Sequence, residues 1–184
     1  INSGIMAIRK SDLIRWLPKL KPANAQGELY LTDMIEIALD ESARVRAVVS
    51  DDADEVMGIN TQWDLCNAER ILQRRRVEEL ALEGVKIADP NRLDIRGEVQ
   101  VGKDCFIDVN VVLNGSVVLG DGVSIGPGSI VSDSKLSAGV KVLPHSVIDG
   151  AEIRANSSIG PFARVRTGTV IGEGAKIGNF VETK

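Results

Sequence analysis

The second half of the chain carries an apolar residue at every sixth position, and this period is its dominant hydrophobic pattern. Ile, Leu or Val recurs from Val101 to Ile177 in steps of six residues, except for two steps of five after Val131 and Ile148. The anchor positions are Val101, Ile107, Leu113, Leu119, Ile125, Val131, Leu136, Val142, Ile148, Ile153, Ile159, Val165, Ile171 and Ile177. A helix needs apolar residues three and four apart, and a half-buried strand needs alternation. A period of six fits neither alone, but it fits a short strand followed by a tight corner.

Residues of particular types follow the anchors at fixed offsets. The residue four positions after most anchors is small or β-branched, as at Cys105 and Ala163, and the residue directly after an anchor is often glycine, as at Gly120. Such a repeat is typical of a solenoid in which every unit makes the same turn. Glycine supplies backbone freedom where a side chain would clash or φ must be positive. We therefore predict three hexads per coil, about 18 residues, with the anchors inside a triangular prism of stacked parallel strands.

Residues 1–60 have a different, mixed pattern. We expect strands at residues 5–9 and 45–50, and helices at residues 11–16 and 29–39. This α/β pattern is too short for a complete α/β domain, so we interpret it as the C-terminal part of a larger sheet domain.

The ends of the chain support the same interpretation. The chain begins with Ile1, and it ends at Lys184 within a hexad, without a capping element. An uncapped solenoid end would expose apolar anchors and unpaired backbone groups. We therefore expect a fragment of a longer protein, with a chain shortened for expression as the alternative.

Residues 61–84 are predicted to form one long linker helix between residues 1–60 and the solenoid of residues 85–184. Thr61 is a favourable N-cap, Asp64 three positions later approximates a capping box, and Gly84 can end the helix. The run Arg74 to Arg76 could bind phosphate. The favoured interpretation is a solvated charged surface, because several glutamates flank the run.

Composition narrows the partners that the chain could have. The formal net charge of −4 and the pI near 5.1 argue against nucleic acid and anionic membranes as partners. Cys66 and Cys105 form no metal motif or disulfide framework, and no apolar run has the length of a membrane span or a signal peptide. We therefore predict a protein of the reducing cytoplasm that binds neither nucleic acid nor membranes.

Several strings, taken in order, resemble one family. They are I-N-S-G at residues 1–4, N-A-Q-G-E-L-Y-L-T-D at 24–33, V-M-G-I-N at 56–60, I-G-P-F-A-R-V-R at 159–166 and I-G-N-F-V-E-T-K at 177–184. Together they resemble the bacterial bifunctional N-acetylglucosamine-1-phosphate uridyltransferase / glucosamine-1-phosphate N-acetyltransferase, over the whole chain. The resemblance implies a mixed fold: the C-terminal piece of an α/β nucleotidyltransferase domain, a linker helix and a left-handed parallel β-helix. It also implies a homotrimer, for which the outward-facing Val112 and Val118 offer apolar contact surface.

The resemblance implies two linked reactions. The solenoid would acetylate glucosamine-1-phosphate with acetyl-CoA, and the N-terminal domain would join the product to UTP, with Mg²⁺, to give UDP-N-acetylglucosamine for peptidoglycan and lipopolysaccharide precursors. Asn2 and Asn60 match asparagines that bind the nucleotide sugar, and Asn60 also matches an oxygen ligand of Mg²⁺. An amide can both donate and accept hydrogen bonds, and Mg²⁺ prefers oxygen ligands. A single amide oxygen makes no metal site, so Asn60 needs a carboxylate from elsewhere.

Arg166 and Lys184 match the residues that bind the sugar phosphate in this family. They are 18 residues apart, so they are expected to stack one coil above the other, about 4.8 Å apart at the backbone. Stacked cations repel each other unless an anion lies between them, and Arg presents a fork that suits phosphate. The residues alone favour solvated surface, and the resemblance favours the site. Arg164 is left as a structural or interface residue.

The single histidine, His145, lies before the V-E-T-K string and does not match the family's catalytic base, so we expect it at a corner or on the surface. The base, the acetyl-CoA groove, the glycine-rich nucleotide loop and the second Mg²⁺ ligand would all lie outside these residues. The chain alone is therefore expected to be inactive, although it belongs to an enzyme. Two alternatives stay open: a hexapeptide acyltransferase of another specificity, and a non-catalytic β-helix scaffold.

Overall fold

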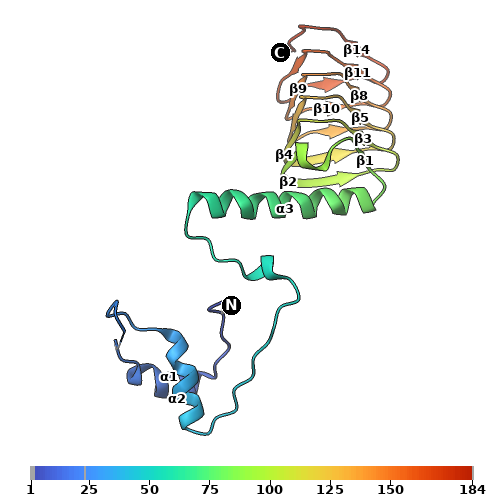
Figure 1. Ribbon diagram of the computed structural model, residues 1–184. Coiled ribbons are helices and arrows are strands. Elements are labelled where there is room, and N and C mark those ends of the chain that lie inside the picture. The colour runs from blue at the N-terminus through green and yellow to red at the C-terminus, as the bar shows by residue number, and fades with distance from the viewer. Residues whose placement is uncertain (1–2, 23, 184) are drawn as a thin grey trace. The chain divides into compact units, whose positions relative to one another are not determined.

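The computed structural model describes residues 3–22 and 24–183 of the chain (Figure 1). The chain divides into two compact units, Ile1–Ala68 and Glu69–Lys184. None of the helices in the described part of the chain is both long enough and apolar enough to cross a membrane.

The first unit is built from short helical segments. They are α1 (Lys10–Trp16), the 3₁₀ helix η1 (Leu17–Lys19), η2 (Leu31–Asp33), α2 (Met34–Asp40) and η3 (Ala53–Val56). The two expected helices are present, although the second begins as a 3₁₀ turn. The two expected strands are wrong, because neither residues 5–9 nor residues 45–50 form a strand. A strand requires a neighbouring strand to satisfy its backbone groups, and the described part of this unit offers none.

A small core joins the two α-helices of the first unit. Trp16 of α1 and Met34 and Ala38 of α2 are buried, and the two helices are in contact. The indole N–H of Trp16 donates to Glu41 Oε2 at 2.9 Å, and Lys19 donates to the other carboxylate oxygen. The hydrogen bond from Lys19, with that from Trp16, lowers the pKa of the Glu41 carboxyl. These contacts hold the helices together without a sheet.

The long helix α3 (Gln62–Leu82) has the expected boundaries. The Asp64 N–H donates to Thr61 Oγ1 at 3.1 Å, and Asp64 Oδ2 accepts from the Thr61 N–H at 2.8 Å, which is a reciprocal capping box. The hydrogen bond from the Thr61 side chain lowers the pKa of the Asp64 carboxyl. At the other end, Gly84 has a positive φ of 99° and the Val85 N–H donates to the Leu80 carbonyl, so the helix ends at the expected glycine.

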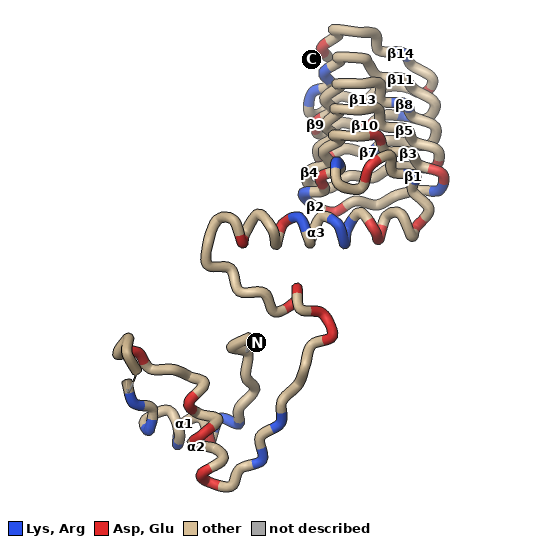
Figure 2. Tube along the Cα trace, in the orientation of Figure 1, with Lys and Arg blue, Asp and Glu red and all other residues tan. Residues whose placement is uncertain are grey.

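Helix α3 covers the open edge of the solenoid with its second part. Gln73, Val77 and Leu80 are buried, and the Gln73 amide bonds both backbone groups of Ile95: Nε2 donates to the carbonyl at 2.8 Å, and Oε1 accepts from the N–H at 2.7 Å. Arg76 also donates to this carbonyl. A side-chain amide thus substitutes for the strand that the first coil lacks. Figure 2 shows charged residues of both signs along α3, in agreement with a solvated surface around Arg74.

The second unit is a parallel β-solenoid whose coils stack into a column (Figure 1). Its strands are β1 (Lys86–Ile87), β2 (Leu93–Val101), β3 (Phe106–Ile107), β4 (Val111–Leu119), β5 (Ser124–Ile125), β6 (Ile130–Ser132), β7 (Lys135–Leu136), β8 (Lys141–Val142), β9 (Val147–Asp149), β10 (Glu152–Ile153), β11 (Ser158–Ile159), β12 (Arg164–Val165), β13 (Val170–Ile171) and β14 (Lys176–Ile177). A 3₁₀ turn, η4 (Pro90–Arg92), precedes β2. All pairings among the described strands are parallel.

The strands form the three walls of a prism. One wall is the six-stranded sheet β1-β3-β5-β8-β11-β14. The other two walls share one sheet, because the long strand β4 turns at Gly115, pairs with β6 before the turn and pairs with β7 after it. The predicted anchors point inward: all from Ile107 to Ile171 are buried, and Val101 and Ile177 are partly buried at the ends of the same core.

The glycines that follow anchors do not all have the same role. A Cβ on Gly120 would lie 2.7 Å from the Ala138 nitrogen of the next coil, so close stacking excludes a side chain there. Gly120 has no positive φ, whereas Gly160, which follows the anchor Ile159, has a φ of 97°; most other left-handed residues of the solenoid lie at other corner positions. In one corner these are Asp104, Gly122, Gly139, Asn156 and Gly174. Asn and Asp tolerate this conformation better than other non-glycine residues.

Candidate functional site

The residues around Arg166 join the end of β12 to the next coil. Arg164 of β12 forms a parallel bridge with Glu182, and the Thr183 N–H donates to the Arg164 carbonyl at 3.0 Å. Residues one coil apart are therefore stacked here, as the spacing predicted. Arg166 is described, whereas Lys184 and Asn2 lie outside the described residues.

The guanidinium of Arg166 is held by Glu182. Its Nε and Nη2 lie 2.8 and 2.7 Å from Glu182 Oε1, and Arg164 Nε lies 3.6 Å from the same oxygen. About half of the Arg166 side chain is exposed, so the cation faces solvent while one edge of it is fixed. Sequence reasoning did not select Glu182. The sequence could have indicated it, because Glu182 follows Arg164 by 18 residues and therefore stacks one coil above it, next to Arg166.

Asn60 lies at the start of α3 and is exposed. Its backbone N–H donates to Asp64 Oδ2 at 3.2 Å, and this oxygen also accepts from the backbone N–H and the hydroxyl of Thr61. The nearest acidic side chain in the sequence is therefore occupied by helix capping. Among the described residues, no group of three His, Cys, Asp or Glu side chains could hold a metal ion. These residues alone do not fit a complete Mg²⁺ site.

His145 lies at a corner of the prism, as expected. It has a positive φ of 58° and is exposed. Its ring stacks on Phe162 at a centroid distance of 5.1 Å, and Phe162 stacks on Phe180 at 5.4 Å. The three rings come from successive coils and form a ladder along one edge of the prism. This contact gives His145 a structural role.

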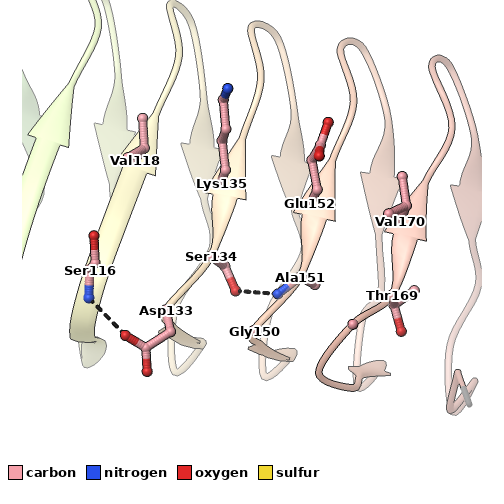
Figure 3. Close-up of a pocket in the computed structure, with 11 residues that line it drawn as sticks. Ser116, Val118, Asp133, Ser134, Lys135, Gly150, Ala151, Glu152, Thr169 and Val170 are labelled. Carbon is pink, nitrogen blue, oxygen red and sulfur yellow. Dashed lines mark hydrogen bonds between the residues drawn. The ribbon is translucent and has the colours of Figure 1, made fainter.

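An open recess of about 390 Å³ lies on the wall formed by β4, β7, β10 and β13 (Figure 3). Both five-residue steps occur at this corner, in successive coils, and a corner that is one residue shorter projects less. The longer corners at Ser116 and Thr169 border the recess on either side. Lys135 and Glu152 project from neighbouring strands in direct register. The recess is lined by Ser116, Val118, Asp133, Ser134, Lys135, Gly150, Ala151, Glu152, Gly168, Thr169 and Val170.

The second unit is a hexapeptide-repeat β-solenoid. Its strands are parallel, its apolar anchors recur every five or six residues, and residues with positive φ lie at its corners. A family model described as the GMPPB C-terminal domain matches residues 95–183. Over its whole length the chain is similar to curated proteins named Bifunctional protein GlmU. The identity is 46% with that of Marinobacter nauticus and 48% with that of Stenotrophomonas maltophilia. These homologues confirm the resemblance found in the sequence.

The chain spans 40% of the length of these curated relatives. Among solved structures, the acetyltransferase domain of PglB from Neisseria gonorrhoeae in complex with acetyl coenzyme A matches with a TM-score of 0.30 and 24% identity. That alignment covers 62% of this chain and 55% of the other.

Proposed function

We propose that the solenoid supplies the sugar-phosphate part of an acetyl-transfer site in a longer bifunctional enzyme, where Arg166 and Lys184 bind the phosphate of glucosamine-1-phosphate. The observation that carries this proposal is the fixed guanidinium of Arg166, held by Glu182 on the coil that continues to Lys184. The identity of 46 to 48% with GlmU proteins over the whole chain supports the same reaction. Acetyl-CoA is the proposed donor of the acetyl group.

The chemistry of the residues suits a phosphate monoester. A guanidinium offers several N–H donors in one plane, and charge-assisted hydrogen bonds to phosphate are stronger than neutral ones. Glu182 occupies one edge of the Arg166 fork, so the remaining donors are available to a ligand and the side chain loses less freedom on binding. Lys184 would add a point charge from the next coil.

The first unit is proposed to belong to the uridylyl-transfer site. Asn2 and Asn60 would contact the nucleotide sugar, with UTP and UDP-N-acetylglucosamine as substrate and product, and Asn60 would lend one oxygen to Mg²⁺. The exposed position of Asn60, next to a capped helix start, leaves its amide accessible. The other Mg²⁺ ligands would come from residues outside this chain. The enzyme is proposed to be cytoplasmic.

The proposed acetyl-transfer role is tested by comparing the binding of ligands with and without the phosphate group. Calorimetry on the full-length protein should detect binding of glucosamine-1-phosphate. Glucosamine, which has no phosphate, should bind at least about 10-fold more weakly, because a charge-assisted phosphate contact is lost. Acetylation of glucosamine-1-phosphate by acetyl-CoA should be measurable with the same protein, and the 184-residue chain alone should show no turnover. Equal binding of both sugars, or no acetyl transfer by the full-length protein, would reject the proposal.

The solenoid is also proposed to assemble as a homotrimer. Ile130 of β6 projects outward with 36% of its surface exposed, in register with Val112 of β4 and Val147 of β9, so this wall carries an apolar stripe. Light scattering of the full-length protein at micromolar concentration should give three times the chain mass. Ile130→Asp should shift the mass toward that of the monomer. The control variant Glu152→Asp, at an exposed and already charged position, should not. A monomeric wild-type protein would contradict this prediction.

A further inference from the structure

The inward column of one prism wall changes from aliphatic to polar beside the candidate site. The residues of this column on successive coils are Ile95, Leu113, Val131, Ile148 and Val165, and all of them are buried. The next position is Thr183, because Glu182 bridges Arg164 one residue earlier. Burying a hydroxyl among aliphatic side chains is unfavourable unless it forms hydrogen bonds. Thr183 is partly buried at the end of this column, and its hydroxyl forms two hydrogen bonds there.

Two hydrogen bonds tie this hydroxyl to both ends of one corner. Thr183 Oγ1 accepts from the Arg166 N–H at 3.1 Å and lies 3.0 Å from Thr169 Oγ1. The corner is closed by a third bond, from the Thr169 N–H to the Arg166 carbonyl at 3.2 Å. A single side chain thus fixes residues 166 and 169 relative to the coil that carries Glu182.

This attachment matters because the salt bridge beside it is exposed. An ion pair at the surface, such as that of Arg166 with Glu182, stabilises little by itself and does not fix the backbones that carry it. The Arg166 N–H donates to Thr183 Oγ1, and this bond, with the contact between the Thr183 and Thr169 hydroxyls, ties the backbone of Arg166 to the coil that carries Glu182. The guanidinium is then pre-oriented before any ligand arrives.

We propose that Thr183, with Thr169, is a positioning residue that sets the Arg166 guanidinium for an anionic, phosphate-bearing ligand. This inference rests on the proposed function of Arg166. Thr183 acts through the backbone of Arg166 and does not itself touch the ligand. Its hydroxyl connects the phosphate-binding corner to the interior of the prism.

Thr183→Val in the full-length protein removes the hydroxyl and keeps the β-branched shape. We expect affinity for glucosamine-1-phosphate, measured by calorimetry, to fall about 3- to 10-fold, as for loss of one net hydrogen bond. KM for this substrate should rise by a similar factor with kcat nearly unchanged, because only binding is affected. The melting temperature should stay the same or rise, since valine suits the aliphatic column. A merely structural threonine would not separate binding from stability in this way.

Two further variants control this experiment. Thr183→Ser keeps the hydroxyl and should bind within about twofold of the wild type. Thr167→Val removes a hydroxyl from the same corner, but Thr167 donates to Asp149 on the preceding coil at 3.1 Å, so binding should not change. Thr183→Val added to Arg166→Ala should cause no further loss, because the two changes remove the same effect.

A second measurement needs no ligand. In ¹⁵N relaxation experiments, the Arg166 Nε–H should be ordered in the wild type and in Thr167→Val, and more mobile in Thr183→Val. The positioning role is overturned if the mobility of Arg166 is unchanged in Thr183→Val. It is also overturned if Thr183→Val and Thr167→Val bind glucosamine-1-phosphate with the same affinity. If the wild-type protein does not bind glucosamine-1-phosphate, the proposed function fails, and the relaxation data still decide whether Thr183 positions Arg166.

Discussion

Replacing Arg166 by alanine in the full-length protein is expected to reduce kcat/KM for acetyl transfer about 10- to 150-fold. The guanidinium contributes charge-assisted hydrogen bonds to phosphate, and losing such a contact typically costs about 1.5–3 kcal/mol. The uridylyl-transfer rate should remain nearly unchanged, because Arg166 lies in the solenoid unit and Asn60 in the other. The two half-reactions are to be measured separately, each with saturating co-substrate.

Arg154 provides a matched control for this variant. It is also an exposed arginine of the solenoid, and its Nε lies 3.9 Å from Glu152 Oε1, so it too is next to a carboxylate. Arg154→Ala should leave both reactions within about twofold of the wild type, as expected for a surface change.

Asn60→Ala should reduce uridylyl transfer and spare acetyl transfer, with part of the loss recovered at high Mg²⁺. Equal loss of both activities in either the Arg166 or the Asn60 variant would contradict the assignment of separate sites.

Gln73→Ala is expected to lower the free energy of unfolding of the solenoid unit by about 1–3 kcal/mol. The buried amide of Gln73 satisfies both backbone groups of Ile95, and a buried donor left without a partner costs about 1–3 kcal/mol. Gln73→Leu fills the same space but makes no hydrogen bond, and it should lose nearly as much. Urea unfolding of the chain measures the loss, and hydrogen exchange at the Ile95 amide localises it, with protection falling at least about 10-fold.

Leu72 is the control for this prediction, because it neighbours Gln73 but is 47% exposed. Leu72→Ala should cost no more than about 0.5 kcal/mol, as is typical of surface substitutions. If Gln73→Leu is as stable as the wild type, packing rather than hydrogen bonding attaches α3 to β2. An unsatisfied sheet edge can also pair with other chains, so concentration-dependent association of Gln73→Ala would accompany the expected loss.

Much of the solenoid was predictable because its information is local and repeated. The hexad anchors determine which side chains face inward, and all from Ile107 to Ile171 are buried as predicted. The ends of α3 could also be predicted from the sequence. The capping contacts of Thr61, Asp64 and Gly84 involve only residues a few positions away. Each of these features depends on near neighbours in sequence or on an identical unit one coil away.

The first unit shows where such local patterns are insufficient. Residues 5–9 and 45–50 have strand-like composition, yet neither forms a strand. A strand exists only when another strand supplies its hydrogen bonds, and apolar composition does not specify that partner. The helix expected at 11–16 is present at 10–16, and that expected at 29–39 is an α-helix only at 34–40; both exist because a helix satisfies its own backbone groups.

The candidate site was only partly determined by the sequence. The spacing of 18 residues predicts that Arg166 lies one coil below Lys184, which is outside the described residues, and the resemblance implies the phosphate. The contacts of Glu182 with Arg166, of Thr183 with the corner and of Gln73 with Ile95 appeared only in the tertiary structure. These contacts join residues between 16 and 22 positions apart, and side-chain geometry decides each one. The period determines which residues stack, because the backbone repeats, but which side chains then bond depends on rotamers and on space that only the folded coils define.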